Sequence, residues 1–286
     1  MNRRQLILTA VMAMLLAASS AQAQWRDILN KVDANRDKIK KTAKVATAMT
    51  HEFTEKEETD IGRIVAARIL ATYPLSPHEK VQKYVTLVGN TVAAYSPRPT
   101  LDWHFSVLDS EVVNAFSTPG GYIFVTSGAL TQMHSEAELA AVLGHEIAHT
   151  TQKHILNEIK RNNVIAAGVD LAQSSASSGS WLNDDMARKI GQTAYEKLFT
   201  TGLSRQDELE ADRLGLGFAT DAGYRASAVV GFLESLGKLS KEGNGTVRQF
   251  TATHPSADDR IAALRPTVSR NEEGQLLAER WDQWTK

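Results

Sequence analysis

The sequence predicts an α+β fold that is mainly helical, with a small β-sheet just before a long central helix. Apolar residues recur at intervals of three and four over residues 54–71, over residues 77–95 and again after residue 135, which is typical of helices that bury one face. Residues 101–107 instead alternate between apolar and polar side chains, which indicates a strand. The pattern along the chain is therefore mainly helical, with a minor β component.

The expected helices begin at recognisable capping signals. Thr54 with Glu57, and Ser135 with Glu138, form capping-box patterns, in which a hydroxyl and a carboxylate bind N–H groups that the first helical turn leaves free. The helix after Ser135 would run for about five turns, which is long enough to cross a domain core.

Two more short strands are expected over residues 112–118 and 122–126, joined at Pro119-Gly120-Gly121. Pro and Gly are the residues that most often allow the chain to reverse between strands. This small sheet comes immediately before the central helix.

The N-terminus has the three parts of a secretory signal peptide. Arg3 and Arg4 precede an apolar core over residues 6–18, and Ala21-Gln22-Ala23 places small residues at a cleavage site. We therefore expect removal of residues 1–23 and a periplasmic location. The apolar core is too short to span a bilayer, and an uncleaved anchor is the alternative.

The rest of the chain divides into three parts. We expect residues 24–53 to form an amphipathic helical extension, residues 54–270 to form the main domain and residues 271–286 to form a C-terminal tail. The Ser-rich residues 173–180 predict a flexible loop, either a lid or a plain connector. The chain has no Cys, and its formal net charge of −1 gives no reason to expect nucleic acid as a partner.

The most informative motif is His145-Glu146-Ile147-Ala148-His149. Side chains four residues apart lie on the same face of a helix, so both imidazoles can bind one ion. Such a pair is half of a zinc site of the metallopeptidase type, in which the Glu beside the first His meets the open coordination position. The plain alternative is a helix with two partly buried His and no metal.

Glu208 is the candidate third ligand, because catalytic zinc commonly takes two His and one carboxylate and leaves its fourth position to water. It falls in the first turns of a helix that we expect to begin after Ser204 and to end near Gly223. Asp212 lies one turn later on the same face and could accept a hydrogen bond from the outer nitrogen of a zinc-bound His. Glu210 points elsewhere and is expected to be a surface charge.

One nearby histidine is excluded from this site, and the two carboxylates have an alternative explanation. His154 lies nine residues after His145, on the opposite side of a continuous helix, so it is excluded as a ligand of the same ion. Ordinary surface charge on an amphipathic helix is the alternative for both Glu208 and Asp212.

Three separated motifs resemble the gluzincin metallopeptidases typified by the CAAX prenyl protease and heat-shock protease X. They are the HEIAH helix, the Glu-x-x-Ala-Asp of residues 208–212, and Thr253-His254-Pro255 followed by Arg260. The soluble periplasmic branch, which includes the β-barrel assembly-enhancing protease, is the closest match. The resemblance runs from about Thr54 to about Pro266. The chain lacks the long apolar runs of the membrane-embedded members, and no tetratricopeptide repeats follow the catalytic domain.

This resemblance implies a zincin-like metallopeptidase domain in which the small β-sheet precedes the HExxH helix. It implies one Zn²⁺ held by His145, His149 and Glu208, with Glu146 as the catalytic base. His254 has two alternative roles. It either becomes a fourth ligand that displaces the water and holds the enzyme inactive, which the periplasmic branch favours, or it donates a hydrogen bond to the oxyanion of the tetrahedral intermediate.

The expected function is zinc-dependent cleavage of misfolded or misassembled envelope proteins in the periplasm, with the outer-membrane assembly machinery as a candidate partner. An exposed strand edge can hold an extended peptide by main-chain hydrogen bonds. The candidate edge consists of Asn114, Ala115 and Phe116, and the alternative is a fully paired internal strand. Two other functions stay open: a periplasmic chaperone or assembly factor with minor proteolysis, and a non-catalytic metal-binding protein.

Overall fold

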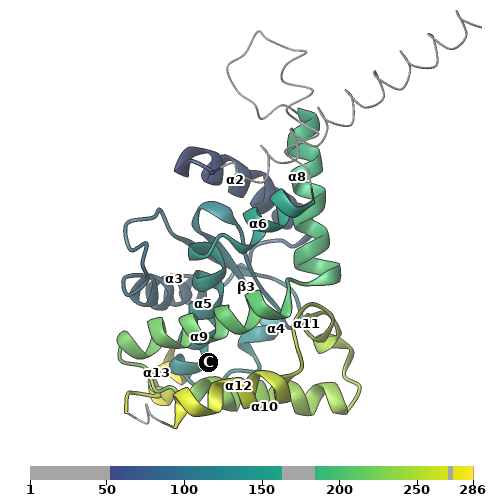
Figure 1. Ribbon diagram of the computed structural model, residues 1–286. Helices are drawn as coiled ribbons and strands as arrows, with labels where there is room; N and C mark the ends of the chain where they lie inside the picture. Colours follow the sequence, from purple (N-terminus) through teal and green to yellow (C-terminus); the bar gives the residue numbers. More distant parts are fainter. Residues whose placement is uncertain (1–51, 163–183, 270–272, 286) are drawn as a thin grey trace, which may run out of the picture. The chain divides into compact units, whose positions relative to one another are not determined.

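A computed structural model describes residues 52–162, 184–269 and 273–285 (Figure 1). These residues form an α+β fold that is mainly helical and contains a three-stranded sheet, so the predicted fold class is confirmed. The predicted signal peptide and the Ser-rich stretch at residues 173–180 lie outside the described residues, as does nearly all of the predicted extension at residues 24–53.

The first two described helices are α2 (Glu55–Thr72) and α3 (Glu79–Ala93). Thr54 caps α2 through the expected capping box, because its hydroxyl accepts from the Glu57 N–H and the Glu57 carboxylate accepts from the Thr54 N–H. α2 packs on the turn before the central strand, and α3 packs on the first strand and on the central helix.

The sheet consists of β1 (His104–Leu108), β2 (Ala115–Ser117) and β3 (Tyr122–Thr126). β3 lies in the middle, parallel to β1 and antiparallel to β2. β2 is therefore an edge strand of this sheet. Asn114, the first residue of the predicted edge, immediately precedes β2.

The connection between β2 and β3 is a single tight turn at Pro119–Gly121. Gly120 and Gly121 both have positive φ values, 75° and 95°, which side chains disfavour. The turn also lies against α2, where a Cβ on Gly62 would sit 1.8 Å from the Pro119 carbonyl oxygen. These glycines let the sheet turn tightly beneath α2.

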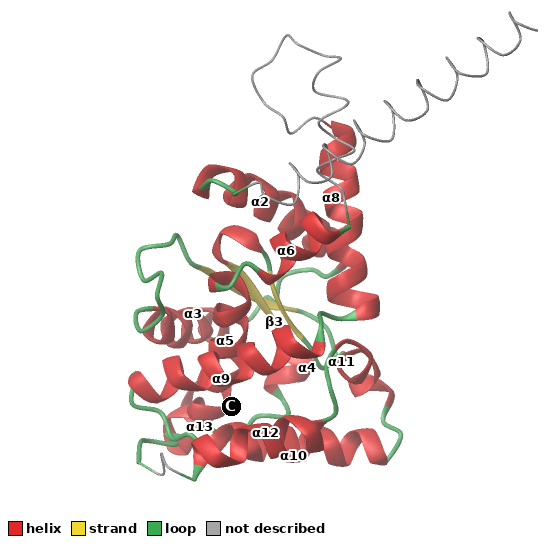
Figure 2. Ribbon diagram, in the orientation of Figure 1, coloured by secondary structure: helices red, strands yellow, loops and turns green. Residues whose placement is uncertain are grey.

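The central helix is α5 (Glu136–Thr151), and nearly all of its residues are buried. It packs against α3, α9 (Arg205–Asp221) and α10 (Ala228–Lys241), and α12 (Ala257–Val268) packs against α9 and α10. Figure 2 shows these helices around α5, with the sheet beside it. The main hydrophobic core includes Leu139, Leu143 and Ile147 of α5.

Shorter helices complete the described part. They are α4 (Ser127–Leu130), α6 (His154–Arg161), α8 (Asp184–Glu196), the π-helical turn Lys197–Thr201, the 3-10 turn Gly245–Val247, α11 (Arg248–Thr253) and α13 (Ala278–Thr285). α12 contains Pro266 and continues to Val268, although proline often ends a helix. Proline removes one N–H, and so close to the helix end this loss does not stop the last turn.

Residues 278–285, within the predicted C-terminal tail, form helix α13 on the main domain. Trp281 is 4% exposed and belongs to the main core, and Arg280 forms an ion pair with Glu136 in the first turn of α5. The tail therefore packs on the central helix. Within the described residues, no helix is long and apolar enough to cross a membrane.

Candidate metal centre

The centre is built on α5, whose N-terminus is fixed by Ser135. The Ser135 hydroxyl accepts a hydrogen bond from the Glu138 N–H at 3.3 Å, as the capping pattern predicts. The Glu138 carboxylate, however, accepts from the N–H of His134 rather than of Ser135. The helix then carries His145 and His149 into the interior, where their exposed fractions are 6% and 4%.

Two glycines let α9 lie unusually close to α5. A Cβ on Gly144 would lie 2.5 Å from the carbonyl oxygen of Gly215, and a Cβ on Gly215 would lie 2.4 Å from the backbone nitrogen of His145. Real Cβ atoms do not come this close, so any side chain here would separate the two helices. The close contact brings the first turns of α9, and with them Glu208, to the two imidazoles.

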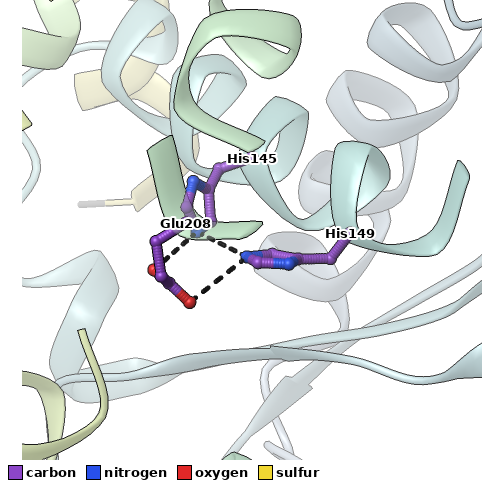
Figure 3. Close-up of side chains that lie close together, drawn as sticks. All are labelled: His145, His149 and Glu208. Carbon is purple, nitrogen blue, oxygen red and sulfur yellow. Dashed lines mark hydrogen bonds and ion pairs between the residues drawn. The ribbon is translucent and has the colours of Figure 1, made fainter. Parts of the chain in front are cut away.

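Three ligand-type side chains meet at this crossing (Figure 3). The Nε2 atoms of His145 and His149 are 2.9 Å apart, and each is 3.7 Å from one carboxylate oxygen of Glu208. All three ligand atoms lie within 4.8 Å of one another, and all three residues are buried. Zinc bonds of about 2.0–2.1 Å place tetrahedral ligands about 3.3 Å apart, so the donor set fits one zinc ion.

Asp212 holds the outer nitrogen of the first imidazole. Its Oδ1 lies 2.9 Å from His145 Nδ1, and Arg260 of α12 donates from Nε to the other oxygen at 2.9 Å. Burial raises the pKa of Asp212, but the Arg260 charge and the His145 hydrogen bond outweigh it, so this pKa lies well below its ordinary value. Asp212 is therefore an anionic acceptor, placed where the spacing from Glu208 predicts it.

His154 holds the outer nitrogen of the second imidazole, with 2.8 Å between the two Nδ1 atoms. The prediction that His154 lies on the opposite side of the helix from His145 is wrong. α5 ends at Thr151, Lys153 turns the chain with a φ of 58°, and His154 begins α6. The 100° per residue of a continuous helix does not apply across such a turn. His154 is still not part of the three-residue ligand cluster.

Glu146 is 4% exposed and lies beside His145 at the same end of α5. Burial raises the pKa of its carboxyl group, and the charge of His145 and a hydrogen bond from Ser117 of β2 partly offset this rise. Glu146 lines two pockets, and Ala115 and His254 line both as well.

His254 lies directly against Glu208, with 2.6 Å between its Nδ1 and the carboxylate. Its backbone is extended, at φ −122° and ψ 155°, as the following proline predicts. Burial raises the pKa of Glu208, but the charges of His254, His149 and His145 outweigh it and hold this pKa well below its usual range. The choice between the two predicted roles of His254 stays a prediction.

Three residues of this site were missed or left without a role by the sequence. Arg260 entered only as part of a motif, Ser117 was not singled out, and His154 was excluded. Arg260 shares the buried face of α12 with Ile261 and Leu264, so its spacing indicates a buried arginine, which needs an acidic partner, but not which acid that is. The sequence around His154 does not indicate that this histidine is buried. A left-handed turn after a helix is usually marked by Gly or Asn, but here the residue is Lys153.

Comparison with known families settles the class. Residues 79–268 match the model of peptidase family M48. The chain belongs to this family. The family match confirms the predicted resemblance to the metallopeptidases, together with the fold it implies.

Among individual relatives, the chain is 25% identical over 269 residues to a β-barrel assembly-enhancing protease of Yersinia pestis, which covers 91% of this chain and 52% of that protein. It is 27% identical over 231 residues to a putative protease of the same name from Vibrio cholerae, which covers 77% and 46%. It is 32% identical over 172 residues to the mitochondrial metalloendopeptidase OMA1 of Arabidopsis thaliana, which covers 60% and 33%. The chain thus spans about half the length of the two bacterial relatives.

Proposed function

We propose that this M48 chain is a zinc-dependent endopeptidase of the bacterial periplasm that hydrolyses peptide bonds of misfolded or misassembled envelope proteins. The observation that carries the proposal is the buried cluster of His145, His149 and Glu208 at the crossing of α5 and α9. Two imidazoles and one carboxylate are the donor set of a catalytic zinc site, which leaves a fourth position open.

In this proposal each buried group has one task. His145, His149 and Glu208 hold the ion, and the Asp212–Arg260 pair fixes the tautomer and the ring orientation of His145. When bound, zinc brings the pKa of a coordinated water to about 7 and polarises the scissile carbonyl.

Glu146 acts as the general base and then as the general acid. Its carboxylate accepts a proton from the attacking water and passes it to the leaving amine. Burial and the raised pKa suit this role, because the group must hold the proton between the two steps.

The edge strand β2 supplies the proposed substrate contacts. At the two ends of β2, the Asn114 carbonyl accepts from the Thr126 N–H and the Thr118 N–H donates to the Tyr122 carbonyl. The alternating main-chain groups of Ala115 and Ser117 therefore point away from β3. An extended peptide could pair with these outward groups if it takes the place of the Asn114 Oδ1 atom, which accepts from the Ala115 N–H at 3.0 Å. Asn114 lines the adjoining pocket, and its buried Nδ2 has no hydrogen-bond partner among the described residues, so it is available to donate to a substrate carbonyl.

The pocket beside the metal cluster favours apolar substrates. It is lined by Val142, Phe232, Leu233 and Phe250, together with His145 and Glu146. Misfolded proteins expose apolar side chains that folded proteins bury, so such a pocket favours unfolded chains. The names of the bacterial relatives and the predicted signal peptide support an envelope location.

The test is cleavage of a reduced, unfolded model protein by the purified mature chain. We expect cleavage that stops when a chelator removes the metal and returns on addition of Zn²⁺. The second candidate, a chaperone with minor proteolysis, predicts that aggregation of the model protein is suppressed equally with and without the metal. Absence of metal-dependent cleavage would reject the endopeptidase.

A further inference from the structure

The two imidazoles of the metal centre have different partners on their outer nitrogens. His145 faces a carboxylate, at 2.9 Å from Asp212, whereas His149 faces a second imidazole, at 2.8 Å from His154. The rings of His149 and His154 meet edge to face, with centroids 4.9 Å apart and an interplanar angle of 74°. His154 is 2% exposed, so this contact is shielded from water.

The turn at Lys153, which directs His154 toward His149, is fixed by contacts before and after it. Lys153 adopts the left-handed conformation, with a φ of 58°, which residues with bulky side chains rarely adopt. Its ammonium group pairs with Glu58 of α2, a buried carboxylate that also pairs with Arg98 at 2.8 Å. Behind the turn, α6 is anchored by buried apolar residues, among them Ile155 and Ile159. The position of His154 is therefore fixed by packing.

The far nitrogen of His154 points at acidic groups of α9. His154 Nε2 lies 3.6 Å from Glu210 Oε2 and 3.8 Å from Asp207 Oδ1, and within the described part of the chain it has no hydrogen-bond partner. Both acids belong to the helix that also carries Glu208 and Asp212. The sequence placed Glu210 at the surface, and it is 40% exposed, yet it is one of the charges nearest to His154.

Proton placement along this chain of contacts follows from the metal. An imidazole that binds an ion through Nε2 carries its proton on Nδ1, so His149 donates to the Nδ1 of His154. His154 must then accept on Nδ1 and carry its own proton on Nε2. That N–H faces the carboxylates of Asp207 and Glu210, which attract it.

We propose that His154 is a positioning residue for the metal centre: it fixes the tautomer and ring orientation of His149 and ties this ligand, through Asp207 and Glu210, to α9. The inference rests on the proposed function, because it requires the metal at the cluster. α9 would then support both imidazoles of α5, His145 directly through Asp212 and His149 through His154.

The test compares two substitutions of His154 with a surface control. His154→Phe keeps a buried ring but removes the acceptor, and His154→Asn keeps an acceptor near the position of Nδ1. His134→Phe makes the same exchange at a histidine that is 72% exposed. Three quantities are measured: the zinc Kd by chelator competition, the visible spectrum of the Co²⁺-substituted protein, and the urea midpoint of the metal-free protein.

We expect His154→Phe to weaken zinc binding about 10- to 100-fold and to shift the Co²⁺ bands, since both report how His149 is held. His154→Asn should restore most of the affinity and the spectrum, and the urea midpoints of the metal-free proteins should match wild type. His134→Phe should behave as wild type throughout.

Two results would overturn the proposal. One is a His154→Phe protein with a zinc Kd within about twofold of wild type and unchanged Co²⁺ bands. The other is an equal loss of affinity in the Phe and Asn proteins together with lowered urea midpoints, which would assign His154 a purely structural role. A wild-type protein that binds no zinc would instead reject the metal site itself, so the two failures are distinguishable.

Discussion

Glu146 has only one task in the proposed reaction, so its substitution separates catalysis from metal binding. Glu146→Gln keeps the size and removes the proton acceptor, and the group is not among the clustered ligand atoms. Turnover of an unfolded protein should fall about 10²- to 10⁴-fold, the usual contribution of a general base, with the zinc content unchanged. The cleavage rate and the zinc content are measured on the same protein. Cleavage near the wild-type rate would rule out Glu146 as the general base.

His254 offers a test whose sign decides between two mechanisms. His254→Ala removes the ring that lies 2.6 Å from the Glu208 carboxylate. If His254 acts as an inhibitory fourth ligand, as we favour, its removal should raise the cleavage rate. If it stabilises the oxyanion, the rate should drop about 10²- to 10³-fold. An unchanged rate, with zinc still bound, would contradict both roles.

For single residues, the sequence predicted the relative positions of those that share a regular helix. His145 and His149, and likewise Glu208 and Asp212, are four apart, so helical geometry alone places each pair on one face. His154 could not be placed in this way, because the chain leaves the helix at Lys153. Arg260 belongs to a third helix, and its contact with Asp212 depends on packing that no local pattern encodes.

Among the elements, the crossing of α5 and α9 is sensitive to a single methyl group. Gly144→Ala places a Cβ 2.5 Å from the Gly215 carbonyl oxygen, so the helices must separate. We expect the free energy of unfolding to fall by about 1–3 kcal/mol and the zinc Kd to rise, because Glu208 moves away from both imidazoles. Urea unfolding and chelator competition measure the two effects.

Gly217→Ala is the matched control on α9. A Cβ on Gly217 meets nothing within 4 Å. The same substitution should therefore stabilise the helix by up to about 1 kcal/mol and leave the zinc Kd unchanged. If both variants showed the same change in the free energy of unfolding and in the zinc Kd, the close helix crossing would not set the geometry of the site.

The edge strand β2 gives a second prediction for an element. The Ala115 N–H points away from β3 and is bound by the Asn114 side chain at 3.0 Å, so it is not a bond of the existing sheet. Ala115→Pro removes this donor, and kcat/KM should fall about tenfold while zinc stays bound. Ala115→Ser keeps the N–H and serves as the control. Normal turnover of the Pro protein would reject β2 as the substrate edge.

Most elements were predictable because their ends carry local chemistry. The capping box at Thr54 and the cap at Ser204 begin helices where the sequence indicates. Two details depended on context instead. The Glu138 carboxylate accepts from the N–H of His134 and not from that of Ser135, and α12 continues past Pro266 because the missing N–H lies near the helix end.

For the molecule as a whole, the sequence indicated which elements exist but not how they surround α5. The periodicity of α5 predicted one apolar face, whereas the helix is buried almost all round. Its buried polar residues have partners on other elements, such as Arg280 for Glu136 and Asp212 for His145, which a pattern of apolar residues cannot reveal. The C-terminal segment is the clearest case, since the predicted tail contains Trp281 of the main core.

The proposed activity depends on one ion held between α5 and α9, and metal analysis of the purified mature chain tests this directly. We expect about one zinc per chain in the wild-type protein. We also expect that Glu208→Ala, on the helix opposite the two imidazoles, loses most of this zinc and the chelator-sensitive cleavage with it. A Glu208→Ala protein that retains a full equivalent of zinc and wild-type cleavage would contradict the proposed metal site.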